Sequence, residues 1–146
     1  MNKIPFALAI LAIIIFSACS DRTEKKSTSE DEGKTCIEKI MEADAEAGQI
    51  RNHACETQSL SAAIHTYVKT LKELDFGDCP PVFDKAFNKH IADWEAIVEI
   101  SDKYPDLRGE MHDLFKELEQ SPDQEEFKKR VDKMWASWKE VEQQIQ

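Results

Sequence analysis

The chain is poor in residues that form turns, with four glycines and five prolines among 146 residues. Aromatic residues make up only 8% of it, and 19 basic residues are outnumbered by 29 acidic ones, which gives a formal net charge of -10. Because such a charge repels phosphate backbones and anionic lipid headgroups, we expect neither nucleic-acid binding nor electrostatic docking to membranes. A chain of this length holds one small domain at most.

Short motifs of common catalytic and cofactor sites are also missing. The sequence contains no phosphate-binding loop, zinc-protease helix, nucleophile elbow, CxxC redox pair or CxxCH haem-attachment motif. No glutamate stands three residues before a histidine, which excludes the Glu-x-x-His ligand pairs of di-iron bundles. We therefore predict a protein that is not an enzyme and needs no cofactor.

The first residues have the pattern of an export signal. Lys3 provides a positive charge, and an apolar run covers residues 4–18. This run is shorter than the roughly 20 apolar residues of a membrane-spanning helix, and Asp21 and Arg22 follow it closely. We predict that residues 1–18 are a signal peptide, with a cleaved secreted protein and an uncleaved anchor as alternatives to the lipoprotein interpretation that follows.

The end of the apolar run, Phe16-Ser17-Ala18-Cys19, resembles the lipobox of bacterial lipoprotein precursors. The resemblance implies that the thiol of Cys19 receives diacylglycerol and that signal peptidase II cuts between Ala18 and Cys19. Ser20 after the cysteine then favours the outer membrane, with an inner-membrane or surface-exposed anchor as alternatives. On this basis we expect a protein of the bacterial cell envelope, attached to a membrane through its lipid.

A polar segment separates Cys19 from the body of the protein. Residues 20–34 contain no apolar side chain, so they cannot bury enough surface to offset the loss of chain entropy. We predict that residues 19–34 form a disordered tether with a reach of roughly 20 Å. The folded domain is then predicted to occupy residues 35–146.

The body has helical spacing throughout, and alternation typical of strands is nearly absent. We predict an all-α antiparallel bundle with about four main helices plus a short one. The last helix should start with Ser121 as its cap and Pro122 at its first position. Its inward positions repeat at steps of four and three: Phe127, Val131, Met134, Trp138, Val141 and Ile145.

A third helix is predicted after Cys79-Pro80-Pro81, to end or bend at Pro105. Its inward positions have the same spacing: Phe83, Phe87, His90, Trp94, Ile97, Ser101 and Tyr104. Residues 106–119 should form a short helical piece, either separate or continuing the third helix beyond a bend.

The helical pattern before residue 75 allows two interpretations. Residues 50–74 form a strongly amphipathic pattern, a first helix covers residues 36–47, and Gly48 is the hinge that we predict between them. Since one glycine costs a helix only about 1 kcal/mol, a single helix of about 40 residues, lying along 81–119 as a hairpin, is the alternative. The lengths of the partner helices favour the bend.

Two side chains in the predicted helices merit attention as candidate binding residues. His90 lies at an inward position one turn before Trp94, and we interpret it as a core histidine bonded to a neighbouring helix. The alternative is a metal or haem ligand held between helices. Trp135 falls beside the inward positions, so it is the aromatic residue that we predict to meet a protein partner.

Three cysteines follow Cys19, and this odd number leaves at least one free or paired between molecules. A disulfide needs Cα atoms within about 7 Å, and no pairing is comfortable in a simple bundle. Cys36 with Cys79 is the least unfavourable, because it needs only that the first helix start beside the 77–81 loop. The disulfide assignment stays open at this point.

The Cys79-Pro80 loop before a helix with Phe83, His90 and Trp94 resembles small exported helical proteins without an assigned activity. Our functional hypothesis is a lipid-anchored helical module that acts by binding another protein or as an envelope component. One alternative is a bundle that binds haem, copper or zinc through His90. The other is an enzyme whose His90, His65 or carboxylate site has no recognisable motif.

Overall fold

The helix boundaries follow capping chemistry and a few tertiary contacts. The computed structural model describes residues 35–145, which lie in the unit Gly33–Gln146. These residues form α1 (Cys36–Ala54), α2 (Leu60–Lys72), α3 (Pro81–Ser101), α4 (Met111–Leu118) and α5 (Gln124–Glu142), with no strand among them. The predicted all-α bundle of four main helices and a short one is confirmed. The predicted signal peptide, cleavage site, lipidation of Cys19 and tether lie outside the described residues.

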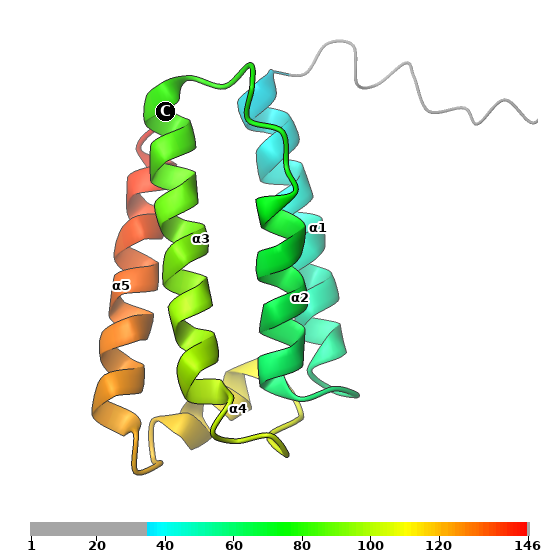
Figure 1. Ribbon diagram of the computed structural model, residues 1–146, viewed down its shortest axis with the longest axis vertical. Helices are drawn as coiled ribbons and strands as arrows, with labels where there is room; N and C mark the ends of the chain where they lie inside the picture. The colour runs from blue at the N-terminus through cyan, green and yellow to red at the C-terminus, as the bar shows by residue number, and fades with distance from the viewer. Residues whose placement is uncertain (1–34, 146) are drawn as a thin grey trace, which may run out of the picture. The chain divides into compact units, whose positions relative to one another are not determined.

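The four long helices run alternately in opposite directions, and α4 lies at the end of the bundle where α1 turns into α2 (Figure 1). Close backbone contacts join α1 to α2, α2 to α3 and α3 to α5, whereas α1 and α5 make few or none. The bundle is therefore an open series of helix pairs rather than a closed ring. None of the helices in residues 35–145 is long and apolar enough to cross a membrane.

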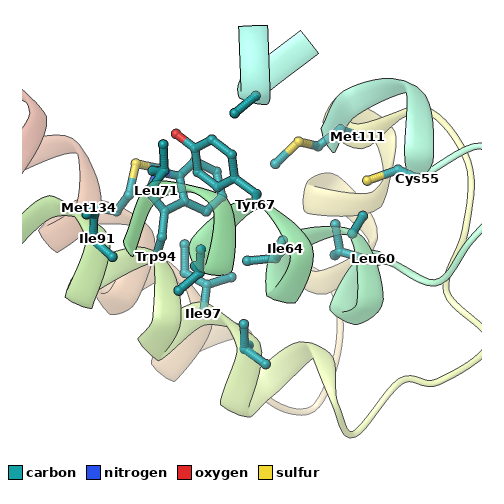
Figure 2. Packing of buried hydrophobic residues seen from close by; sticks show 14 of the residues in the cluster. Cys55, Leu60, Ile64, Tyr67, Leu71, Ile91, Trp94, Ile97, Met111 and Met134 are labelled. Carbon is teal, nitrogen blue, oxygen red and sulfur yellow. The ribbon is translucent and has the colours of Figure 1, made fainter. Parts of the chain in front are cut away.

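The apolar faces of α2 and α3 supply most of the core (Figure 2). The largest fully buried side chains on these two helices are Leu60, Ile64, Leu71, Phe83, Phe87, Ile91, Ile97 and Ile100. In contrast, the only buried residues of α1 are Ile40 and Ala47. Burial of apolar surface is the main favourable contribution to folding. Of the long helices, α1 is therefore the one that packing against the core stabilises least.

The predicted hinge at Gly48 is wrong, because α1 continues through this residue to Ala54. The chain breaks at residues 55–59 instead, where the hydroxyl of Ser59 accepts a hydrogen bond from the Ala62 N–H at 3.2 Å and caps α2. The single long helix and the helix over residues 50–74 are wrong for the same reason.

Tertiary contacts hold this break in place. The Gly109 N–H donates to the Cys55 carbonyl and the Leu60 N–H donates to the Leu107 carbonyl, both at 2.8 Å. Backbone groups that a continuous helix would pair locally are thus paired across the fold. Gly109 itself has φ of 150°, a conformation that favours glycine, and it separates α4 from α3.

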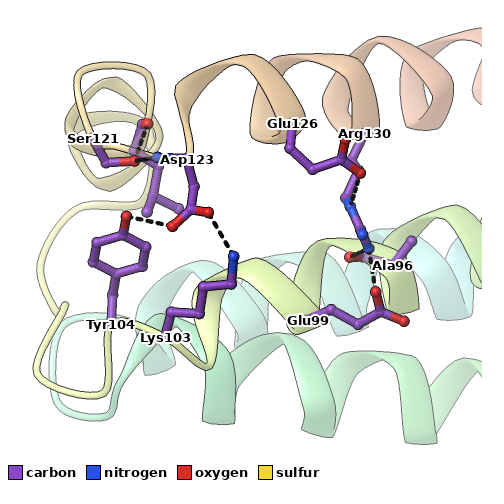
Figure 3. Close-up of polar contacts among 9 residues, drawn as sticks. Ala96, Glu99, Lys103, Tyr104, Ser121, Asp123, Glu126 and Arg130 are labelled. Atoms are coloured by element: carbon purple, nitrogen blue, oxygen red, sulfur yellow. Dashed lines mark hydrogen bonds and ion pairs between the residues drawn. The ribbon is translucent and has the colours of Figure 1, made fainter.

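The start of α5 also differs from the prediction, since the helix begins at Gln124 and not directly after Ser121. The carboxylate of Asp123 accepts hydrogen bonds from Lys103 Nζ at 2.5 Å and the Tyr104 hydroxyl at 2.9 Å (Figure 3). Ser121 Oγ accepts from the Asp123 N–H at 3.2 Å, so it closes a turn before the helix. Asp123 at the start of α5 therefore fastens this helix to the residues that directly follow α3.

Most predicted inward positions of α3 are correct, and those of α5 are correct in part. On α3, which ends at Ser101, the buried positions include Phe83, Phe87, His90, Trp94, Ile97 and Ser101. On α5, Phe127, Met134 and Val141 are buried, whereas Val131 and Trp138 are half-buried and Ile145 is exposed beyond the helix end. The difference arises because α5 packs closely on α3 alone among the long helices.

Cys36 and Cys79 form a disulfide with Cα atoms 5.2 Å apart. It joins the start of α1 to the loop between α2 and α3. This is the pairing that we considered the least unfavourable from the sequence. Cys55, at the end of α1, is free and buried. The disulfide thus fastens the end of the helix that burial holds most weakly.

Candidate functional site

The open side of the bundle contains a groove between α1 and α5. Its volume is about 350 Å³, and α1 provides one wall, α5 the other, and α2 and α3 the floor. The residues that line it are Asp44, Ala45, Gly48, Gln49, Arg51, Asn52, Tyr67, His90, Trp94, Met134, Trp135 and Trp138. Small-molecule sites in proteins are commonly concave, rich in aromatic residues and of this size.

Two aromatic rings form the floor of the groove. Tyr67 and Trp94 meet edge to face, with centroids 5.3 Å apart and ring planes at 78°, and Figure 2 shows both beside Met134 of α5. The guanidinium of Arg51 lies over both rings, with Cζ 4.4 Å from the Tyr67 centroid and 4.3 Å from the Trp94 centroid. Cation–π attraction to two rings therefore holds this cation at the groove.

Asp44 lies on the same helix as Arg51, two turns earlier. Its Oδ1 accepts a hydrogen bond from the Tyr67 hydroxyl at 2.5 Å. Burial and the neighbouring Asp44 carboxylate both raise the pKa of Tyr67, so the phenol keeps its proton as the donor in this bond. The carboxylate of Asp44 and the guanidinium of Arg51, both on α1, therefore contact the same tyrosine.

His90 bridges α3 and α5 and has hydrogen-bond partners on both ring nitrogens. Its Nε2 accepts from Trp94 Nε1–H at 3.0 Å, and its Nδ1 lies 3.2 Å from Ser137 Oγ and 3.3 Å from the Met134 carbonyl oxygen. Because an indole N–H only donates, Nε2 must be the acceptor and Nδ1 must carry the proton of the neutral ring.

This arrangement bears on the metal hypothesis for His90. A metal would compete with Trp94 for the Nε2 lone pair, and Nδ1 is directed at acceptors on α5. Within residues 35–145 no group of three or more His, Cys, Asp or Glu side chains is placed to hold a metal ion. The geometry is that of a core histidine bonded to a neighbouring helix, and the Trp138 ring lies tilted against it, with 5.0 Å between ring centroids.

The pKa of His90 is lowered, first by burial and then by the charge of Arg51, while Asp44, the Met134 carbonyl and Asp93 oppose the shift. The unfolded chain has an ordinary pKa of about 6.5 and binds protons more readily. The free energy of unfolding should therefore decrease as pH falls below about 6.5 toward the lowered native pKa, by at most about 1.4 kcal/mol per pH unit.

Urea unfolding between pH 7.5 and 5.5 measures this dependence. His90→Gln should flatten it, whereas His53→Gln, at a side chain 82% exposed, should leave it as in the unmodified protein. A slope that persists in His90→Gln would assign the pH dependence to other groups.

The two tryptophans of α5 lie at the lip of the groove. Trp135 is 56% exposed, in agreement with its predicted place beside the inward positions. Trp138 is half-buried, and its Nε1 donates to Glu142 at 3.1 Å, so it is not the fully buried residue that we predicted. Both indoles are therefore accessible to a molecule in the groove.

Another hollow lies between α3 and α5 and is smaller, at about 210 Å³. Of the three cations that line it, Arg130 is engaged by Glu99, Glu126 and the Ala96 carbonyl (Figure 3), and Lys129 pairs with Glu126 at 3.8 Å. Asp93 Oδ2, buried there without a hydrogen-bond partner, is the one unsatisfied side-chain atom of this kind in the described residues. We regard this hollow as a structural contact between helices, since its charges are largely satisfied.

Sequence reasoning singled out His90 and Trp135 and missed Asp44 and Arg51. Their seven-residue spacing puts both on one face of α1, but acidic helices contain many such pairs, so the signal was weak. Tyr67 falls within the amphipathic pattern over residues 50–74, from which we predicted a helix and no binding residue. In comparisons with protein-family models, curated proteins and solved structures, the chain matches none of them.

Proposed function

We propose that the protein is a lipid-anchored, non-enzymatic binding module of the bacterial envelope, which holds a small organic ligand in the groove between α1 and α5. The observation that carries this proposal is a concave site with aromatic walls and a half-buried guanidinium that no carboxylate pairs with among the described residues. Sites of this kind bind ligands by burying apolar surface and orienting them through a few polar groups.

The envelope location is supported by the lipobox-like Phe16-Ser17-Ala18-Cys19 and the polar tether after it. The Cys36–Cys79 disulfide adds support, because disulfides persist in oxidising compartments and are rare in a reducing cytosol. Lipidation of Cys19 places the domain near a membrane, with the outer membrane favoured.

Binding is favoured over catalysis because the described part of the groove has no nucleophile paired with a free base. His90 is the only histidine there, and its Nε2 already accepts from Trp94. A general base must lie within hydrogen-bond reach of the proton that it abstracts, and Asp44, the carboxylate that lines the groove, already accepts from the Tyr67 hydroxyl. A protein partner that docks on Trp135 is a second proposal, which its 56% exposure favours.

The proposal is tested by native mass spectrometry of the full protein after gentle extraction from its own cell envelope, followed by denaturation of the same sample. The expected result is a chain that starts at Cys19 with a diacylglycerol-sized increment and that loses a small organic molecule on denaturation. The Cys19→Ala variant should lose the lipid and leave the membrane fraction. Haem or metal as the lost mass would support the alternative bundle, and no lost mass would contradict the binding function.

A further inference from the structure

Arg51 is a cation with unused capacity for ion pairing. Its Nε and Nη2 donate to the neutral Asn52 Oδ1 at 3.2 and 2.9 Å, and no carboxylate in the described residues forms an ion pair with it. Burial lowers its pKa, and Tyr67 and Asp44 only partly oppose this shift. Half-buried guanidinium groups favour bidentate pairing with a carboxylate or phosphate, so a ligand that brings an anionic group would complete the site.

Asp44 is the opposite charge of the same groove. One of its oxygens accepts from the Tyr67 hydroxyl, and no lysine or arginine in residues 35–145 forms an ion pair with it. The residue is half-buried and lines the groove, so a donor there can approach its carboxylate. Because Asp44 is bonded to the hydroxyl of Tyr67 and Arg51 lies over its ring, the two charges border the same tyrosine, and one small molecule in the groove can reach both.

We propose that the ligand is a zwitterion of the α-amino acid type with an aromatic side chain, an inference that rests on the proposed function. The carboxylate pairs with Arg51, the ammonium with Asp44, and the aromatic ring lies against Trp135 and Trp138. A ligand with only an anionic group would leave the Asp44 carboxylate unpaired, and a ligand with only a cationic group would leave the Arg51 guanidinium unpaired. The formal net charge of -10 repels anions at long range, whereas a zwitterion carries no net charge.

The three tryptophans at the groove make the proposal measurable, because a ligand that covers them changes their fluorescence. L-phenylalanine is the probe, titrated into the full-length protein in detergent. N-acetyl-L-phenylalanine lacks the ammonium and represents a peptide C-terminus, and L-phenylalaninamide lacks the carboxylate and represents a peptide N-terminus. We expect L-phenylalanine to bind at least about tenfold more tightly than either analogue, since each analogue leaves one charge of the groove unpaired.

Two variants test the two ion pairs separately, because each removes one charge of the groove. Asp44→Asn keeps an oxygen that accepts from Tyr67, and it should weaken L-phenylalanine about tenfold while leaving N-acetyl-L-phenylalanine unchanged or tighter. Arg51→Gln should weaken L-phenylalanine and N-acetyl-L-phenylalanine and spare L-phenylalaninamide. Lys128→Gln, at a position of α5 that does not line the groove and is 72% exposed, is the control that should bind as the unmodified protein does. Circular dichroism of each variant checks that the helices are retained.

The outcomes distinguish this inference from the function on which it rests. Equal binding of L-phenylalanine and one analogue, with no effect of the Asp44 or Arg51 variant, would overturn the zwitterion and assign the groove to a singly charged ligand or a peptide end. Failure of all three probes, with a different small molecule released in the native mass spectrum, would overturn the ligand class and leave the binding function intact. Failure of the probes with no released molecule would overturn both.

Discussion

Replacing Phe87 with Ala should lower the free energy of unfolding by about 3–5 kcal/mol, as large-to-small changes of buried phenylalanines do. The Phe87 side chain is 0% exposed and lies between aromatic neighbours, with ring centroids 5.5 Å from Phe76 and 5.6 Å from Phe83. Truncation would remove the transfer free energy of the ring and leave a cavity beside Phe76, Phe83 and His90. Urea unfolding at constant pH gives the value directly.

The matched control is Val82→Ala, on the same helix but 63% exposed. Its effect should stay within about 0.5 kcal/mol, because exposed positions away from special contacts tolerate truncation. A loss of less than about 1 kcal/mol at Phe87 would contradict the buried face assigned to α3. Trp138→Ala should have a smaller effect than Phe87→Ala, since Trp138 is half-buried at the groove.

Removing the disulfide with Cys36→Ser and Cys79→Ser should lower the free energy of unfolding by about 4 kcal/mol, from the entropy of the closed loop. The bridge joins residues 43 apart in sequence. Loss of the disulfide should destabilise α1 first, because Ile40 and Ala47 are the only buried residues of this helix. Hydrogen exchange should therefore show α1 opening before α2 and α3.

Reductant provides the control for the disulfide experiment. It should destabilise the unmodified protein and have no further effect on the double variant, whereas Cys55→Ala should stay sensitive to it. Since α1 contributes Asp44 and Arg51 to the groove, ligand affinity should fall together with stability. A double variant as stable as the unmodified protein would show that burial alone holds α1.

Several features of the fold were predictable because they depend on local spacing. The inward positions of α3 from Phe83 to Ser101 repeat every three or four residues, and packing on both sides of this central helix makes the repeat strict. On α5 the same reasoning placed Trp138 and Ile145 in the core, where they are not. Only the contact pattern of the helices reveals that α5 has one open side.

The sequence by itself determined the helical class and the central buried positions, because these follow from periodicity within a few turns of chain. Tertiary structure decided the break at residues 55–59, where Cys55 and Leu60 pair with residues near position 108. It also decided the groove, where Arg51, Tyr67 and Trp94 come from three different helices. Contacts between segments so far apart in the chain depend on how the helices pack, and local propensity does not encode them.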